Sequence, residues 1–207
     1  MIPRFHCLTD VPDAGQPLDG RWSRQLAAVV EAGVDAVQVR AKHLSDRALC
    51  LLAEEVVRIL GPSGARVIVN DRVDVALAAG AHGVHLGLDD IPVRAARRAA
   101  PPGFLVGATC RSSEHARRAR AEGADYAGVG PLYRSSTKAG LPDPIGHERI
   151  REVAEVLPVI GISGITADRV PEVLAGGAHG VAVTAAVWRS PDPPGAAKEI
   201  ADLVHSR

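Results

Sequence analysis

The sequence predicts an α/β protein folded as one compact (β/α)8 barrel, the TIM-barrel architecture, over residues 1–207. Eight short apolar segments alternate with longer segments of helical pattern along the chain. A glycine-centred segment recurs four times, each time directly before an expected strand. Dividing 207 residues among eight units leaves about 26 for each, which is sufficient for a βα unit. An open doubly wound sheet is the alternative, but eight regular units without a leftover segment favour a closed barrel.

The expected strands are four to six residues long and consist mainly of β-branched or small apolar residues. That composition is typical of parallel strands that are buried on both faces. The eight segments span residues 5–10, 36–40, 66–71, 83–87, 105–109, 126–130, 159–163 and 181–184.

The expected helices begin after capping residues and end at glycine or proline, which stop helices for different reasons. Apolar residues recur at three- and four-residue spacing within them, as one buried helix face requires. The four clearest examples are a helix over 46–59 after Ser45 and before Gly61 and Pro62, a helix from Ser112 to Gly123, a helix from 146 to 157 before Pro158, and a helix capped at Thr166 that runs to Leu174.

The recurring segment places a glycine at the end of each preceding helix, where a left-handed residue is needed. Its copies come before the second, fourth, sixth and eighth strands. His82 and His179 occupy matching positions in two copies, which indicates a structural role in the loop. The four copies span residues 31–37, 78–84, 121–127 and 175–181, with glycines at 33, 80, 123 and 177.

The balance of charge and the low aromatic content limit the class of partner. Lys+Arg and Asp+Glu both total 24, and aromatic residues make up 3% of the chain. A chain without a basic excess or stacking side chains is not expected to bind nucleic acid. A membrane partner is not expected either, because no apolar segment reaches the roughly 18 residues that cross a bilayer and the N-terminus lacks a signal-peptide pattern.

The three cysteines are odd in number and widely spaced, which fits neither a disulfide framework nor a zinc site. Cys7, Cys50 and Cys110 are interpreted as small apolar residues of a protein in the reducing cytoplasm. Small molecules are therefore the expected partners. Self-association into a homo-oligomer stays open.

Polar residues collect where the expected strands end, and (β/α)8 barrels carry their active sites at that end. Carboxylates stand beside cations there, a combination that suits Mg²⁺ held jointly by the protein and the phosphate oxygens of a substrate. In strand order the residues are Gln38, Arg40 and Lys42; Asn70 and Asp71; His85, Asp89 and Asp90; Thr109 and Arg111; the segment 134–138; Ser163 and Gly164; and Thr184.

A second anion site is expected at the turn over residues 161–166. Its backbone N–H groups, together with the loop after the eighth strand, match the usual phosphate site of such barrels. Two structural alternatives stay open among the candidate residues. The segment Asn70–Arg72 could instead serve only as an N-terminal cap of the helix that follows it, and His85 could be a satisfied histidine of the barrel interior.

Four motifs carry a family resemblance, and their order along the chain makes them specific together although each is weak alone. They are Gln38–Lys42, Val69–Asp74, Gly83–Asp90, and the stretch from Ala124 to Lys138. With these motifs the chain resembles the thiamine phosphate synthase / thiazole tautomerase family over nearly its full length. The resemblance implies a (β/α)8 transferase that joins 4-amino-2-methyl-5-hydroxymethylpyrimidine diphosphate to a thiazole phosphate, giving thiamine phosphate and diphosphate.

The resemblance also implies roles for individual residues, with Lys138 and Thr109 as the catalytic ones. No general base or covalent nucleophile is required, because diphosphate leaves readily once its charge is neutralised. Carried over by position, it implies Mg²⁺ ligands at Asp71 and Asp90; diphosphate contacts at Arg40, Lys42, Asn70, Thr109 and Lys138; pyrimidine contacts at Gln38 and His85; thiazole phosphate contacts at Ser135 and Thr137; and a phosphate cup of Gly164, Thr184 and Ala185.

Departures from the family pattern keep two other functions open. The family's Glu, Gln and Ser are Ala41, Leu88 and Ala185 here, and Arg111 stands where the family has His. A thiazole tautomerase acting on thiazole carboxylate phosphate is one alternative, and a non-catalytic phosphate-ligand binding protein is the other. The tautomerase branch commonly has His at the position of Pro131 and lacks the metal aspartates, so this sequence favours the synthase.

Overall fold

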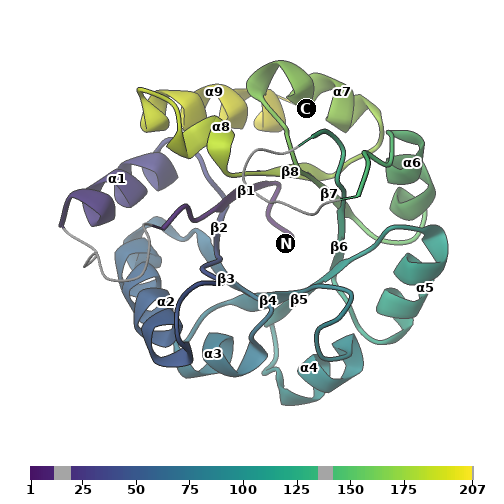
Figure 1. The fold of residues 1–207 in the computed structure, drawn as a ribbon, viewed down its shortest axis with the longest axis horizontal. Helices are drawn as coiled ribbons and strands as arrows, with labels where there is room; N and C mark the ends of the chain where they lie inside the picture. The colour runs from purple at the N-terminus through teal and green to yellow at the C-terminus, as the bar shows by residue number, and fades with distance from the viewer. Residues whose placement is uncertain (12–19, 135–141, 207) are drawn as a thin grey trace.

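The computed structural model describes residues 1–11, 20–134 and 142–206, and these form a closed barrel of eight parallel strands. The strands pair in sequence order, and the last pairs with the first. Figure 1 shows the strands as an inner ring with the helices around it. The expected (β/α)8 barrel is confirmed, and the open-sheet alternative is wrong because no strand is left at an edge among the eight.

Seven strands lie inside the segments predicted for them, and the eighth begins one residue earlier. The strands are β1 (Phe5–Leu8), β2 (Ala36–Val39), β3 (Arg66–Asn70), β4 (Gly83–Leu86), β5 (Leu105–Thr109), β6 (Tyr126–Val129), β7 (Val159–Ile162) and β8 (Gly180–Val183). The helices are α1 (Gly20–Glu31), α2 (Asp46–Leu60), α3 (Val73–Ala78), α4 (Val93–Ala99), α5 (Ser113–Ala121), α6 (Glu148–Ala154), α7 (Val170–Ala175), α8 (Ala185–Trp188) and α9 (Pro193–His205), with the 3-10 turns η1 (Gly61–Ser63) and η2 (Ala167–Arg169).

Two serines cap helices as predicted. The Ser45 hydroxyl accepts a hydrogen bond from the Ala48 N–H at 3.3 Å at the start of α2. The Ser112 hydroxyl accepts from the His115 N–H at 3.2 Å at the start of α5. Each bond satisfies a backbone donor that the first helical turn leaves without a carbonyl partner.

The predicted end of α2 is confirmed, because the helix stops at Leu60 and Gly61 follows it. Gly61 itself has a right-handed φ of −45°, and the left-handed residue is Gly64, with a φ of 75°, after η1. Two other boundary predictions are wrong. Thr166 makes no side-chain cap, because η2 intervenes before α7 begins. The helix expected to reach Leu157 ends at Ala154.

The glycines of the four repeats all take the left-handed conformation that the sequence predicts. Each ends a helix and turns the chain into the next strand within three residues, which keeps the βα units short. The φ values are 112° at Gly33, 68° at Gly80, 99° at Gly123 and 101° at Gly177.

A polar side chain two residues after each of these glycines ties the even-numbered strands to their neighbours. Three of these side chains accept a hydrogen bond from a strand N–H, and the fourth, His179, contacts a backbone carbonyl oxygen. Both His82 and His179 therefore have the structural role predicted for them. Asp35 accepts from Phe5 at 2.9 Å, His82 from Val67 at 3.0 Å and Asp125 from Val106 at 2.7 Å, while His179 Nε2 lies 3.1 Å from the Ile2 carbonyl oxygen.

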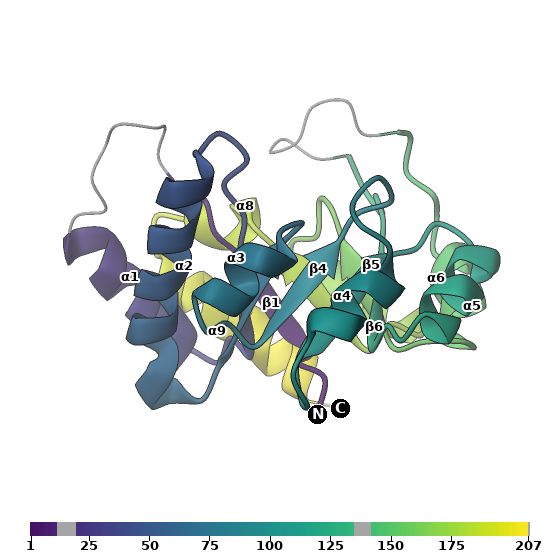
Figure 2. The same cartoon turned by 90° about the horizontal axis from the view of Figure 1, so that it is seen from below.

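The main core is an aliphatic layer between the strands and the helices, and a smaller cluster of Leu8, Tyr126, Ile160 and Ala182 fills the barrel interior. Small side chains let the helices pack close to the ring, which explains how so few aromatic residues suffice. Figure 2 shows both chain termini at one end of the barrel, with loops that follow the strands at the other. Within the described residues, no helix is long and apolar enough to span a membrane.

Asp125→Ala should lower the free energy of unfolding by about 1–3 kcal/mol, because it leaves the Val106 N–H without its acceptor and breaks the 2.5 Å ion pair with Arg97. Chemical denaturation measures the change. Asp202→Ala is the control, since it removes an exposed ion pair with Lys198 worth less than about 1 kcal/mol. If the two substitutions lowered the free energy of unfolding equally, the structural role of the Asp125 carboxylate would be refuted.

Candidate active site

A cavity of about 790 Å³ opens at the end of the barrel where the strands finish. Every predicted site residue within the described part of the chain lines it, so residues spread over most of the sequence meet in one place. They are Gln38, Arg40, Lys42, Asn70, Asp71, His85, Asp90, Thr109, Gly164, Thr184 and Ala185. Ser135, Thr137 and Lys138 lie outside the described residues, so their predicted roles stay predictions.

Asp71 is held in an unusual backbone conformation directly after β3. Its φ is 67°, in the left-handed region that side chains other than glycine rarely adopt. Its N–H donates to the His85 carbonyl oxygen at 2.8 Å, and its carboxylate forms a 2.7 Å ion pair with Lys42. These contacts fix the carboxylate inside the cavity, and such strained residues concentrate at functional sites.

The alternative that Asn70–Arg72 serves only as a helix cap is wrong, because no side-chain capping bond is made at the start of α3 and Asp71 is held in the cavity. The residue at the capping position of α3 is Arg72, and it makes no side-chain capping bond. The Arg72 guanidinium instead pairs with Asp74, at 2.6 Å, and with Asp46 at the start of α2. The turn after β3 is therefore braced from outside the cavity while Asp71 points into it.

Asp90 stands beside Asp71, and each carboxylate affects the pKa of the other. The Gly87 N–H donates to Asp90 Oδ2 at 2.6 Å, and a Cβ at Gly87 would lie only 2.9 Å from that oxygen. Burial would raise the pKa of Asp71, but its ion pair with Lys42 and its interaction with Asp90 outweigh that and hold it below its usual value. Burial, together with the neighbouring Asp71 carboxylate, raises the pKa of Asp90.

This carboxylate pair suits Mg²⁺, a hard cation that prefers oxygen ligands. A divalent cation between Asp71 and Asp90 would offset the repulsion of two adjacent negative charges. Among the described residues, no cluster of three or more His, Cys, Asp or Glu side chains could hold a metal ion. A Mg²⁺ ion held by this pair would take its remaining oxygen ligands from water or from substrate phosphate groups.

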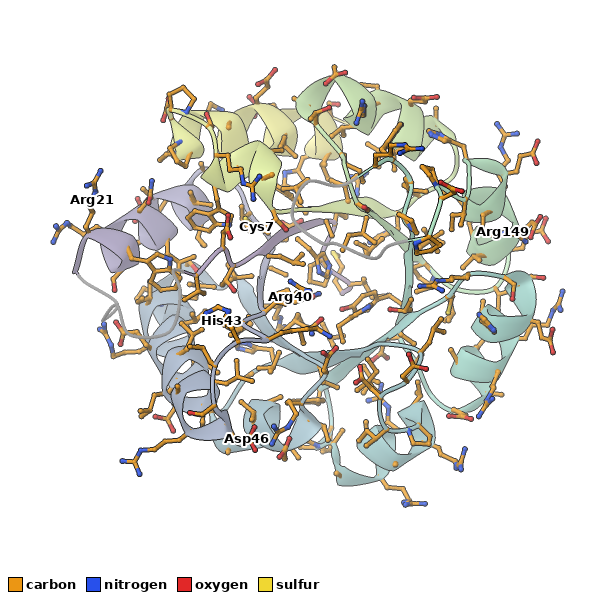
Figure 3. The ribbon with its side chains drawn as sticks, viewed as in Figure 1. Cys7, Arg21, Arg40, His43, Asp46 and Arg149 are labelled. Atoms are coloured by element: carbon orange, nitrogen blue, oxygen red, sulfur yellow. The ribbon has the colours of Figure 1, made fainter. Side chains whose placement is uncertain are left out.

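Cationic side chains complete this half of the cavity. Arg40 follows β2, and Figure 3 shows it inside the ring of strands, whereas Arg21 and Arg149 point outward from their helices. Thr9 fixes the Arg40 backbone by accepting from its N–H at 2.9 Å and donating to its carbonyl oxygen at 3.2 Å. The role of Thr9 could not be predicted from the sequence, because no motif marks a hydroxyl that bonds to the backbone of the neighbouring strand.

His85 packs in the barrel interior and also lines the cavity, while its predicted contact with a ligand stays a prediction. Its ring stacks on Tyr126 with centroids 5.6 Å apart, and its Nε2 lies 3.2 Å from Thr109 Oγ1. Two glycines make room for it. A Cβ at Gly107 would lie 2.6 Å from His85 Nδ1, and a Cβ at Gly128 would lie 2.6 Å from His85 Cε1.

The second predicted anion site lies across the barrel from Asp71, because β7 is four strands from β3 in the closed ring. Ser163 and Gly164, which follow β7, have φ values of 84° and 66°. Gly164 cannot be replaced without strain, since its Cβ would lie 2.5 Å from the Arg134 carbonyl oxygen. Thr184 and Ala185 bring the end of β8 to the same side of the cavity.

Comparison with known proteins gives consistent matches. Residues 11–187 match the family described as thiamine monophosphate synthase. The thiamine-phosphate synthase of Methanoculleus marisnigri is 45% identical over 188 residues, which cover 89% of each chain. The thiamine biosynthesis bifunctional protein ThiM/ThiE of Symbiobacterium thermophilum is 48% identical over 181 residues, which cover 86% of this chain and 38% of that longer protein.

Solved structures agree. Thiamine phosphate pyrophosphorylase from Pyrococcus furiosus has a TM-score of 0.84 and 32% identity over 98% of this chain and 96% of its own. A 3-hexulose-6-phosphate synthase, at 17% identity and a TM-score of 0.73, shares the fold alone.

A closed barrel with a charged cavity at the carboxyl ends of its strands defines a (β/α)8-barrel enzyme. The chain belongs to the thiamine monophosphate synthase family, since the family match covers most of its length. The family resemblance of the sequence motifs is therefore confirmed.

Gly107→Ala should destabilise the protein and disorder the His85 side chain. The new methyl group would lie 2.2 Å from Tyr126 Cζ and 2.6 Å from His85 Nδ1. We expect a loss of about 1–3 kcal/mol in the free energy of unfolding, as overpacking of a core produces. Gly61→Ala is the matched control, since a Cβ there meets nothing within 4 Å and φ is right-handed. A Gly107 variant as stable as the Gly61 variant would contradict this packing.

Proposed function

We propose that the chain is a Mg²⁺-dependent thiamine-phosphate synthase of the cytoplasm, with the whole activity in one domain. The transferase class and the place in thiamine biosynthesis follow from relatives such as the thiamine-phosphate synthases of Methanoculleus marisnigri and Methanospirillum hungatei, at 45% and 43% identity. One observation supports the assignment of the site. A charged region with paired carboxylates and a phosphate-type turn face each other across a single cavity.

The proposed reaction exchanges one bond for another at the pyrimidine methylene carbon. The bond from this carbon to a diphosphate oxygen breaks, and its electron pair leaves with the diphosphate. The thiazole nitrogen supplies the electron pair of the new carbon–nitrogen bond, so the protein need not remove a proton. The barrier then depends on how well negative charge on the departing diphosphate is stabilised.

Arg40 and Lys42 are placed to stabilise that charge, and Asn70 follows β3 beside them. Asp71 and Asp90 would hold Mg²⁺, which when bound supplies positive charge to the diphosphate oxygens. Lys138 is proposed to add a further cation from the loop after β6. The chemistry of these side chains is what supports the proposed binding of Mg²⁺ and of phosphate groups.

Gln38, His85 and Thr109 are proposed to orient the pyrimidine. Gln38 is only 4% exposed, so its side-chain amide is held in one position where it reaches the cavity wall. Gly164, Thr184 and Ala185, with Ser135 and Thr137, are proposed to hold the thiazole phosphate on the opposite side. Because binding already holds both substrates in line, the reaction step itself carries much less of the entropic cost of bringing two substrates together.

Asp90→Asn should reduce diphosphate release from pyrimidine diphosphate and thiazole phosphate about 100-fold or more, because it removes one of two metal carboxylates. Asp89→Asn is the matched control. It neutralises the next residue of the same loop, which also lines the cavity but lies outside the pair. Its turnover should stay within about threefold of the wild-type value. Steady-state diphosphate release with and without EDTA measures both.

Other outcomes point to the alternative functions. No diphosphate release, with EDTA-independent isomerisation of thiazole carboxylate phosphate, would identify a tautomerase and overturn the synthase proposal. Neither reaction, with retained binding of thiazole phosphate, would identify a non-catalytic binding protein. Equal losses in the Asp89 and Asp90 variants would remove Asp90 from the metal site.

A further inference from the structure

We propose that Arg169 is a positioning residue that holds the Gly164 turn in the form that binds the thiazole phosphate, and that it thereby sets the affinity for this substrate. The inference rests on the proposed function, because that function places the phosphate at this turn. Arg169 belongs to none of the motifs of the sequence analysis, yet it lines the cavity.

The turn after β7 needs external support. Two successive residues, Ser163 and Gly164, have positive φ values, and for a serine this conformation is unfavourable. Among bonds between described residues, none uses the N–H of Gly164 or Ile165 as a donor, and both residues line the cavity. Two backbone donors are therefore available to an anion as long as the turn keeps this shape.

Arg169 acts on the peptide that joins those two residues. Its Nη1 donates to the Gly164 carbonyl oxygen at 2.5 Å. Because the carbonyl and N–H of a trans peptide point in opposite directions, this bond turns the Ile165 N–H away from Arg169. A charged donor on the carbonyl also polarises the peptide and strengthens its N–H as a donor.

Tyr133 holds Arg169 in place. The guanidinium lies 4.3 Å above the centre of the Tyr133 ring, which suits a flat cation on an aromatic face. The Tyr133 hydroxyl donates to Glu172 Oε2 at 3.0 Å. Partial burial, and then this hydrogen bond, raise the pKa of Tyr133 to about 12, so the hydroxyl keeps its proton at neutral pH.

The same tyrosine is tied to the turn through its backbone. Its N–H donates to the Ser163 carbonyl oxygen at 3.1 Å, and the Ser163 hydroxyl donates to the Tyr133 carbonyl oxygen at 3.2 Å. His147 packs edge-on against the ring, with centroids 5.6 Å apart. Arg169, in η2, thus connects the turn after β7 to Tyr133 in the loop after β6 and, through Tyr133, to Glu172 in α7.

A substitution at Arg169 should affect one substrate selectively. Arg169→Ala should raise the KM for thiazole phosphate about tenfold or more, as expected for loss of a charged hydrogen bond, while kcat and the KM for pyrimidine diphosphate change less than about threefold. With the thiazole alcohol, which lacks the phosphate, wild type and variant should behave alike. Arg149→Ala is the matched control, since Arg149 points outward from α6 and pairs with Glu152.

Two further measurements keep the test decisive. Arg169→Lys retains the charge but loses the flat stacking, and it should give an intermediate KM even if the alanine variant does not fold. Calorimetric titration with inorganic phosphate should show the same order of affinities without any turnover. If wild type releases no diphosphate, the proposed function fails, and the phosphate titration still tests Arg169. Equal changes of KM for both substrates and the alcohol, or no change, would overturn the inference.

Discussion

The 2.7 Å ion pair between Lys42 and Asp71, with Asp90 beside it, is the interaction on which the proposed chemistry depends. Burial and then the neighbouring Asp71 carboxylate raise the pKa of Asp90, whereas the ion pair with Lys42 helps to hold the pKa of Asp71 below its usual value. The charge of Lys42 also acts on Asp90 but does not reverse the direction of its shift. The left-handed backbone at Asp71 and the close approach of Gly87 to Asp90 exist to keep this pair together, so the local strain has a chemical purpose.

The barrel explains how such a cluster coexists with a balanced net charge. Closure of eight strands brings residues from β2, β3 and β4 to one side of a single cavity and residues from β7 and β8 to the other. The charge that matters is therefore local, while the chain as a whole sums to zero. The opposite end of the barrel is occupied by the Asp35, His82 and Asp125 contacts, which stabilise the strands and leave the cavity end free for function.

Much of this could be predicted from the sequence, for physical reasons. Strand positions follow from short apolar runs, and the repeat glycines follow from the backbone conformation at helix ends. Asp71 and Asp90 follow strand ends, where a carboxylate by itself indicates an active-site role. Thr166 was wrongly predicted to cap the helix that runs to Leu174, because η2 lies between Thr166 and α7. The parts played by Thr9, Tyr133 and Arg169 were missed, since each acts on a backbone group far away in the chain or depends on a stacking partner.

The central claim is that the Asp71–Asp90 pair is completed by a divalent cation. Calorimetric titration of Mg²⁺ into the protein with bound inorganic diphosphate tests it most directly. Asp90→Asn removes one of the two carboxylates, so it should lower the affinity for Mg²⁺ about tenfold or more, whereas Asp89→Asn should leave it within about threefold of the wild-type value. Equal Mg²⁺ affinity in wild type and the Asp90 variant would contradict the account.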